Sequence, residues 1–181
     1  MSSSYISNEK KILEEIKAVL QKNPESSEKK LAAAIKKSGK TFVFGQGRSG
    51  LMAKSFAMRL AQIGKSTFVV GETVTPPIGK KDLLLVVSGS GETRTVADIA
   101  DEAKTIGAKV FCITSNKESS IAKKSDTVII LKGKTKVSGK SIEPLGSLFE
   151  QSTLIFLDAV ILGLMKKGAE KKMKKRHASL E

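Results

Sequence analysis

Five short apolar runs, separated by helical segments, place the tightest constraint on how this chain can fold. The runs are 41–44, 67–70, 83–87, 110–114 and 127–131, and most of their residues are β-branched or otherwise strongly apolar. Such runs are typical of strands that are covered on both faces. Helical patterns at 49–63, 93–106 and 118–124 stand between most of them. The alternation predicts βαβ units and an α/β fold, with a doubly wound, flavodoxin-like five-stranded parallel sheet and flanking helices.

The remaining segments are predicted to be mostly helical. Apolar residues at helical spacing predict a first helix that ends at Asn23-Pro24, and 26–38 reads as a second helix that ends at Gly39. The segment 71–82 contains adjacent prolines and is predicted to be a loop. The last long helix, 147–166, is apolar almost all round, which predicts contacts with the core and with another subunit. We interpret residues 1–181 as a single domain with two N-terminal helices and a C-terminal helical tail.

Composition and hydropathy indicate the cellular location expected for this chain. Its one cysteine, Cys112, cannot form an internal disulfide, and a cytoplasmic location is expected. The N-terminus lacks the apolar segment of a signal peptide. The longest apolar stretch, 153–165, is short for a bilayer span and contains Asp158, so no membrane partner is expected.

The formal net charge of +14 favours anionic partners, such as nucleic acid, an acidic membrane surface or phosphorylated metabolites. Much of the excess lies in 132–140 and 165–177. Single-stranded nucleic-acid sites combine charge with stacking aromatic residues, but neither run contains one, and the chain has no Trp and one Tyr. The pattern therefore argues against nucleic acid and favours a solvated, lysine-rich surface.

Two glycine-rich turns follow predicted strands. In the first, Gly45, Gly47 and Gly50 fit G-x-G-x-x-G, and Glu72 follows at about the distance of a ribose-binding acid. A dinucleotide site is therefore an open alternative.

The second turn, Ser88–Thr93 (SGSGET), is called the hydroxyl turn below. Its hydroxyl groups donate hydrogen bonds to oxyanions, its glycines allow close approach, and a helix N-terminus follows. These features predict a phosphate site. An FMN phosphate and a turn without any ligand are the alternatives, although an aromatic content of 4% argues against a flavin.

Several segments together resemble the 6-phospho-3-hexuloisomerase family of the sugar-isomerase (SIS) domain proteins. They are "FGQGRSG", "AMRL", "VGETVTPP", "VVSGSGETRTV", "PLGSLFEQSTLIFLDAVILGLM" and "RHASLE", within about residues 35–181. The resemblance implies interconversion of D-arabino-3-hexulose 6-phosphate and D-fructose 6-phosphate. It also implies no metal or organic cofactor, and a homotetramer whose active sites lie between subunits.

The resemblance also implies roles for individual residues. The family's phosphate loop falls on Ser88, Gly89, Ser90, Gly91, Glu92 and Thr93, and its substrate-facing first turn falls on Arg48 and Ser49. Glu150 matches the catalytic base that would move a carbon-bound proton through a 2,3-enediol, and His177 would exchange protons with the sugar oxygens.

Both catalytic assignments have structural alternatives. Ser147 and Glu150 have the spacing of a capping box, in which Ser147 is the N-cap, and the two roles of Glu150 are not exclusive. His177 is also explained as an exposed member of a basic tail. At the level of function, the alternatives are a non-catalytic sugar-phosphate-binding module and another sugar-phosphate aldose–ketose isomerase.

Overall fold

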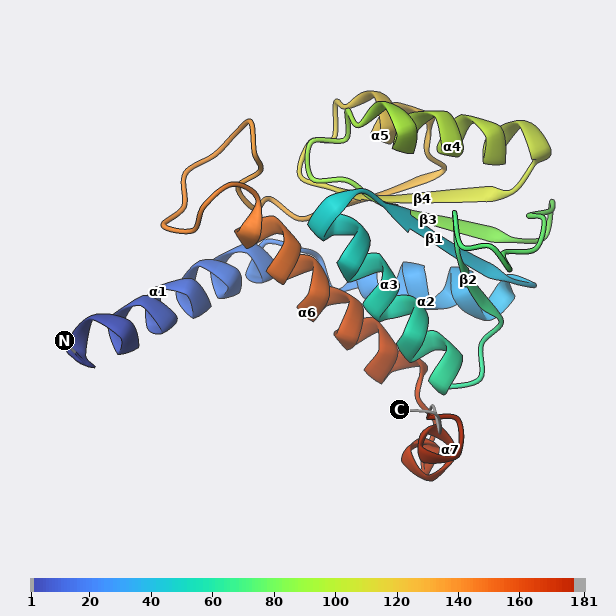
Figure 1. Ribbon diagram of the computed structural model, residues 1–181, viewed down its shortest axis with the longest axis horizontal. Helices are drawn as coiled ribbons and strands as arrows, with labels where there is room; N and C mark the ends of the chain where they lie inside the picture. Colours follow the sequence, from blue (N-terminus) through green and yellow to red (C-terminus); the bar gives the residue numbers. More distant parts are fainter. Residues whose placement is uncertain (1, 178–181) are drawn as a thin grey trace.

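A parallel five-stranded sheet lies between two layers of helices in the computed structural model, which describes residues 2–177 (Figure 1). The strands are β1 (Thr41–Gly45), β2 (Thr67–Val69), β3 (Leu83–Val87), β4 (Lys109–Thr114) and β5 (Thr127–Ile130). Their order is β2-β1-β3-β4-β5, and every pairing is parallel. The predicted flavodoxin-like sheet is therefore confirmed.

The helices divide between the two faces of the sheet. On one face lie α4 (Arg94–Ile106) and α5 (Ser120–Lys124). On the other lie α1 (Ser2–Gln21), α2 (Ser26–Lys37), α3 (Gly47–Gln62) and α6 (Ser147–Leu164), and α7 (Ala169–Lys175) follows α6. Alternate residues of β3 supply the two cores: Leu84 and Val86 join one, whereas Leu83, Leu85 and Val87 join the other. The fully apolar run thus fits a strand covered on both faces.

The apolar helix α6 is a core helix. Within residues 2–177 its length and hydropathy would allow it to cross a membrane, but 61% of its residues are buried inside the protein. It packs between α2 and α3, while Ile155 and Leu162 stay exposed.

Cys112 lies inside β4 and is fully buried, as its position in an apolar run predicted. Burial raises the pKa of its thiol to about 12. The thiol is therefore protonated at neutral pH and is a poor nucleophile.

The backbones of β1 and α3 meet at two glycines. A Cβ added to Gly50 would lie 2.4 Å from the carbonyl oxygen of Gly45, which is closer than Cβ atoms approach other heavy atoms in real proteins. Only a residue without a side chain allows this strand and helix to approach so closely.

We expect Gly50→Ala to lower the free energy of unfolding by about 1–3 kcal/mol, because the new methyl group overpacks two backbone segments. Thermal unfolding of the variant measures the loss. The matched control is Gly163→Ala in α6, where an added Cβ meets nothing within 4 Å. Alanine is the better helix former there, so the control should be neutral or stabilising, and an equal loss in both variants would contradict this explanation.

Candidate functional site

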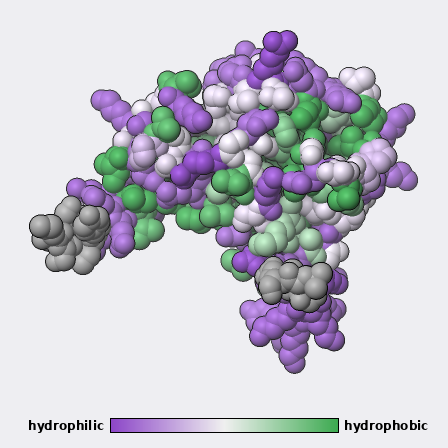
Figure 2. Space-filling model, in the orientation of Figure 1, coloured by the Kyte–Doolittle hydropathy of each residue, from purple (hydrophilic) through white to green (hydrophobic). Residues whose placement is uncertain are grey.

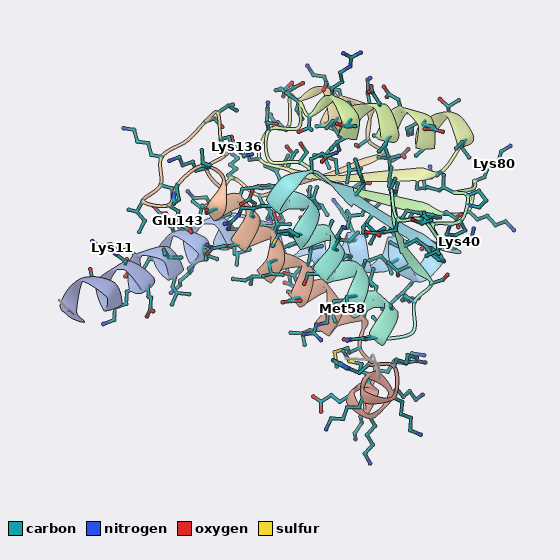
Figure 3. The ribbon with its side chains drawn as sticks, in the orientation of Figure 1. Lys11, Lys40, Met58, Lys80, Lys136 and Glu143 are labelled. Carbon is teal, nitrogen blue, oxygen red and sulfur yellow. The ribbon has the colours of Figure 1, made fainter. Side chains whose placement is uncertain are left out.

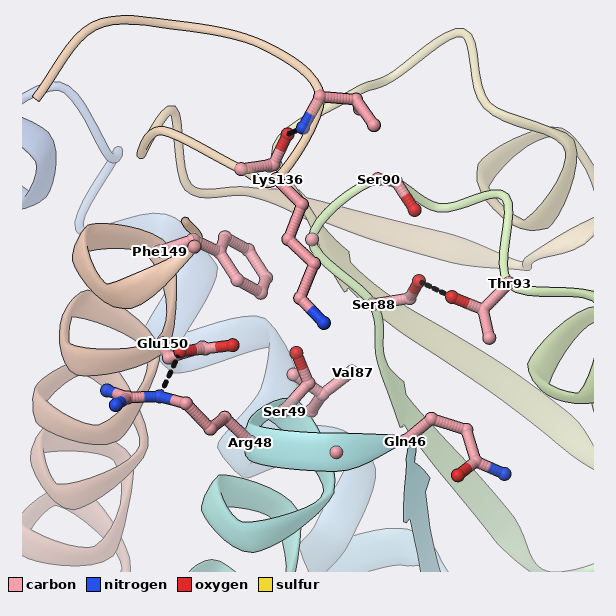
Figure 4. A pocket seen from close by; sticks show the side chains of 15 residues that line it. Gln46, Arg48, Ser49, Val87, Ser88, Ser90, Thr93, Lys136, Phe149 and Glu150 are labelled. Carbon is pink, nitrogen blue, oxygen red and sulfur yellow. Dashed lines mark hydrogen bonds and ion pairs between the residues drawn. The ribbon is translucent and has the colours of Figure 1, made fainter. Parts of the chain in front are cut away.

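A cavity opens at the carboxyl ends of β1 and β3. Gly45 pairs with Val87 in the parallel register, so the two glycine-rich turns that follow these strands lie side by side. The strand order reverses between β1 and β3, which is where doubly wound sheets bind ligands. The cavity has a volume of about 270 Å³ and is lined by Gln46, Gly47, Arg48, Ser49, Val87, Ser88, Gly89, Ser90, Thr93, Thr135, Lys136, Val137, Gly146, Phe149 and Glu150 (Figure 4). This volume suits a ligand of sugar-phosphate size better than a dinucleotide.

The hydroxyl turn supplies one side of this cavity. The Ser88 and Thr93 hydroxyl oxygens lie 3.3 Å apart, and Ser88 Oγ also accepts a hydrogen bond from the Gly91 N–H. Thr93 is the N-cap residue of α4 but its side chain makes no capping hydrogen bond. The turn therefore places hydroxyl groups beside an uncapped helix N-terminus, an arrangement that suits phosphate oxygens.

Two residues of the hydroxyl turn, Gly91 and Glu92, lie outside the cavity lining. Gly91 has a φ of +69°, and a Cβ there would lie 2.0 Å from Ser119 Oγ. Glu92 Oε1 accepts a hydrogen bond from the Ser120 N–H at 2.9 Å, and the hydrogen bonds from Ser120 lower the pKa of Glu92. The structure thus places both residues where they attach the turn to α5.

Glu150 and Arg48 form an ion pair at the opposite side of the cavity (Figure 4). Arg48 Nε donates to Glu150 Oε2 at 2.5 Å. The Glu150 side chain is 6% exposed, whereas that of Arg48 is 56% exposed. The two residues belong to the first turns of α6 and α3, so their ion pair joins the N-terminal ends of these helices.

The capping-box prediction is wrong. Gly146 is the N-cap of α6, and no side chain makes a capping hydrogen bond there. The hydroxyl of Ser147 instead donates to the Pro144 carbonyl at 3.0 Å. Because the helix begins one residue earlier than a Ser147 cap requires, the carboxylate of Glu150 is available to Arg48 and to the cavity.

His177 does not line this cavity. It lies beside Arg59, Gln62 and residues of α7, at the C-terminal end of α3. Arg48 is at the other end of that helix, which at about 1.5 Å per residue puts about 20 Å between the two ends. The fold of one chain therefore does not bring His177 to Glu150.

The segment 132–146, which we call the pocket loop, contributes residues that sequence reasoning missed. Composition predicts a solvated surface for its lysines, and Lys136 is indeed exposed, but it also lines the cavity. Thr135 is 3% exposed, and its Cγ2 lies 3.3 Å from the position of a Cβ at Gly89. Composition gave no signal for this, because Lys136 differs from its neighbouring lysines only in its position within the folded loop.

Helix α1 is hydrogen-bonded to the pocket loop through Glu15. The Glu15 carboxylate accepts hydrogen bonds from Ser141 Oγ at 2.5 Å and from the Ile142 N–H at 3.2 Å.

Glu143, the next residue of the pocket loop, lies close to the N-terminal end of α6 (Figure 3). Its Oε2 accepts a hydrogen bond from Gln151 at 2.6 Å, while its Oε1 is buried and has no hydrogen-bond partner among the described residues. Burial raises the pKa of Glu143, and the neighbouring Glu15 and Glu150 carboxylates act in the same direction.

The glycine-rich turn of the dinucleotide alternative lies at the cavity, but the acidic residue that this alternative requires does not. Glu72 forms an exposed ion pair with Lys54 at 2.7 Å and is absent from the cavity lining. Among residues 2–177, no group of three His, Cys, Asp or Glu side chains is placed to hold a metal ion.

Comparisons with known proteins point to one family. The sequence pattern of the SIS domain family matches residues 34–155. The 3-hexulose-6-phosphate isomerase of Bacillus subtilis is 49% identical over 157 residues, which cover 83% of this chain and 85% of that enzyme.

Solved structures agree with this match. A crystal structure of a hypothetical protein superimposes with a TM-score of 0.89 at 39% identity, and the match covers 98% of both chains. A second, from Methanococcus jannaschii, has a TM-score of 0.85 at 35% identity and covers 97% of this chain and 99% of that one. For that protein a molecular function of 3-hexulose-6-phosphate isomerase was inferred.

The raised pKa of Glu143 yields a prediction about stability. An acid whose folded pKa lies above its unfolded pKa stabilises the fold at low pH, and this contribution is lost as the pH rises through the folded pKa. We expect Glu143→Gln, which keeps an acceptor for Gln151, to gain stability relative to the parent protein as the pH rises from 4 to 8. Melting temperatures across this range measure the difference. Exposed Glu102→Gln is the control, and a difference that does not change with pH would contradict the assignment.

Proposed function

The chain belongs to the SIS domain family, and from this premise we propose that it is an isomerase that interconverts D-arabino-3-hexulose 6-phosphate and D-fructose 6-phosphate. The observation that carries the proposal is a buried carboxylate, Glu150, in the same cavity as the hydroxyl turn. A cytoplasmic location and independence of metals and organic cofactors are parts of the same proposal.

The two sides of the cavity have different tasks in this proposal. The 6-phosphate lies against Ser88, Ser90 and Thr93 at the N-terminus of α4, while Gly89 lets the turn pack against the ring of Phe149. The carbon chain then extends toward Glu150. Ser49 faces the sugar between these two ends.

The reaction proceeds through a 2,3-enediol. The Glu150 carboxylate removes the proton from C3 of fructose 6-phosphate, the electron pair forms the C2–C3 double bond, and the C2 oxygen gains a proton. The C3 oxygen then loses its proton and becomes the carbonyl, and Glu150 returns a proton to C2. Arg48 holds the Glu150 carboxylate in a fixed orientation between turnovers.

His177 remains the proposed group that exchanges protons with the sugar oxygens. Because it lies at the far end of α3 in its own chain, it must reach the cavity from another copy. This requirement fits the proposed homotetramer with active sites between subunits.

Exposed apolar side chains on α3 and α6 support such an assembly. Leu51 and Met58 of α3, and Ile155 and Leu162 of α6, are each seven residues apart and lie on one face of their helix. We call these four residues the apolar stripe. Hydrophobic surface lies along the region of these helices in Figure 2, whereas α7 is hydrophilic, and Figure 3 labels Met58 on α3. A face of this kind typically becomes buried against another copy.

The central experiment follows fructose 6-phosphate with the protein in D₂O by NMR. We expect signals of a 3-ketohexose phosphate and deuterium at C2 or C3. Glu150→Gln should lower kcat by about 10²–10⁴-fold, because the amide cannot act as the base. Its melting temperature should stay close to that of the parent protein, since Gln still accepts a hydrogen bond from Arg48.

Exposed Glu102→Gln is the matched control and should retain full activity. Isomerisation or exchange at C1 would replace the proposal with an aldose–ketose isomerase. Unchanged spectra, with a melting temperature that the sugar phosphate still raises, would replace it with a binding module.

The proposed assembly is tested by Leu162→Glu, which puts a charge at the most exposed position of the apolar stripe. Light scattering should give about four times the chain mass of 19.4 kDa for the parent protein and a smaller assembly for the variant. Activity should fall with the mass, because His177 would then be lost from the neighbouring site. Thr105→Glu on α4 adds the same charge on the other face of the sheet and should change neither. A monomeric, fully active parent protein would rule out the shared site.

A further inference from the structure

Lys136 directs its ammonium group into the cavity. In Figure 4 its side chain enters from the pocket loop, passes Ser90 and ends in the space between Glu150 and the Ser88–Thr93 pair. The ammonium thus lies over the part of the cavity that the carbon chain of a bound sugar phosphate would occupy.

Two cations line this cavity, and they differ in their partners. Arg48 is engaged by Glu150 through its Nε. Lys136 forms no ion pair with a carboxylate in the described part of the chain. Its charge is therefore available to a bound anion or to charge that develops during a reaction.

Hydrogen bonds within residues 135–138 hold the segment around Lys136 in a turn. The Thr135 N–H donates to the Ser138 carbonyl at 2.9 Å, the two hydroxyl oxygens lie 3.0 Å apart, and the Val137 N–H donates to Thr135 Oγ1. Gly133, on the other side of Thr135, packs so closely against Phe149 that an added Cβ would lie 2.7 Å from its Cα. These contacts attach the segment that carries Lys136 to the first turn of α6, which also carries Glu150.

We propose that the Lys136 ammonium donates a hydrogen bond to the sugar oxygens at C2 and C3 and stabilises the negative charge that develops there. This inference rests on the proposed isomerase function. When Glu150 takes the proton from carbon, the electron pair of the C–H bond forms the C2–C3 double bond and the carbonyl π pair moves to the substrate oxygen, so one negative charge passes from the carboxylate to the enediolate. Arg48 remains paired with the Glu150 carboxylate during this proton transfer. Lys136 is therefore the cation that stabilises the negative charge on the substrate oxygen.

The phosphate is already provided for elsewhere in the cavity. Three hydroxyl groups and the uncapped N-terminus of α4 lie together at the hydroxyl turn. A cation that bound the phosphate would stabilise substrate and transition state alike and would change KM. A cation that stabilises the developing oxyanion instead lowers the energy of the transition state alone, and its removal changes kcat.

The test compares Lys136→Met, which keeps the length of the side chain and removes its charge, with Lys136→Arg. For the methionine variant we expect kcat with fructose 6-phosphate to fall about 10²-fold while KM stays within about threefold of the parent value. The shift in melting temperature that fructose 6-phosphate causes should persist, since binding at the hydroxyl turn is intact. The arginine variant should recover part of kcat.

Lys140→Met is the matched control, because Lys140 is an exposed lysine of the same pocket loop that does not line the cavity. It should match the parent protein in kcat and KM. An unchanged kcat for Lys136→Met would overturn the inference, whether KM stays the same or rises, and a rise in KM alone would reassign Lys136 to the phosphate. The parent enzyme measured beside them separates the two proposals: if it is inactive, the isomerase function itself fails and this inference fails with it.

Discussion

The parallel pairing of β1 with β3 decides which residues can meet in the cavity. Since Gly45 lies opposite Val87, the chain leaves both strands at the same level and in the same direction. The sheet grows outward from this pair in two directions: β2 is added beside β1, whereas β4 and β5 are added beside β3. The helices that follow β1 and β3 therefore lie on opposite faces of the sheet, and no connection fills the space above the pair. The hydroxyl turn and the start of α3 are brought together by this register alone, before any side chain is considered.

The ion pair between Arg48 and Glu150 adds the second side of the cavity. A carboxylate as buried as that of Glu150 is costly to ionise without a partner, and Arg48 supplies one from the adjacent helix. Because Arg48 remains more than half exposed, water screens part of the attraction. The pair therefore fixes the direction of the carboxylate more than it contributes to stability. That balance suits the proton transfer proposed for Glu150.

Much of the architecture was accessible from the sequence because it depends on local patterns. The apolar runs predicted all five strands, and the hydroxyl turn was identified from side-chain chemistry that repeats within six residues. The features that the sequence did not predict depend on how the loop before α6 folds and on contacts between distant segments. Ser147 and Glu150 have the spacing of a capping box, but the preceding Pro144 carbonyl takes the serine hydroxyl and Arg48 takes the carboxylate. Lys136 and Glu143 look like ordinary charged residues until the pocket loop is folded over α6. No local pattern could place His177 at the opposite end of α3 from the cavity.

The hydrogen bonds that Glu15 accepts from the pocket loop connect α1 to a segment that lines the cavity, although α1 lies outside the region that matches the SIS domain. A long loop that is free in solution loses conformational entropy when a ligand orders it, and this loss weakens binding. Here Ser141 and Ile142 of the pocket loop are hydrogen-bonded to α1, which packs on α6. Part of the entropy cost of ordering the loop is therefore met when the chain folds, before a ligand binds. Replacing Glu15 would therefore increase the number of conformations that the loop samples, without changing any residue that lines the cavity. A helix that contributes no side chain to the cavity thus limits the freedom of a segment that lines it.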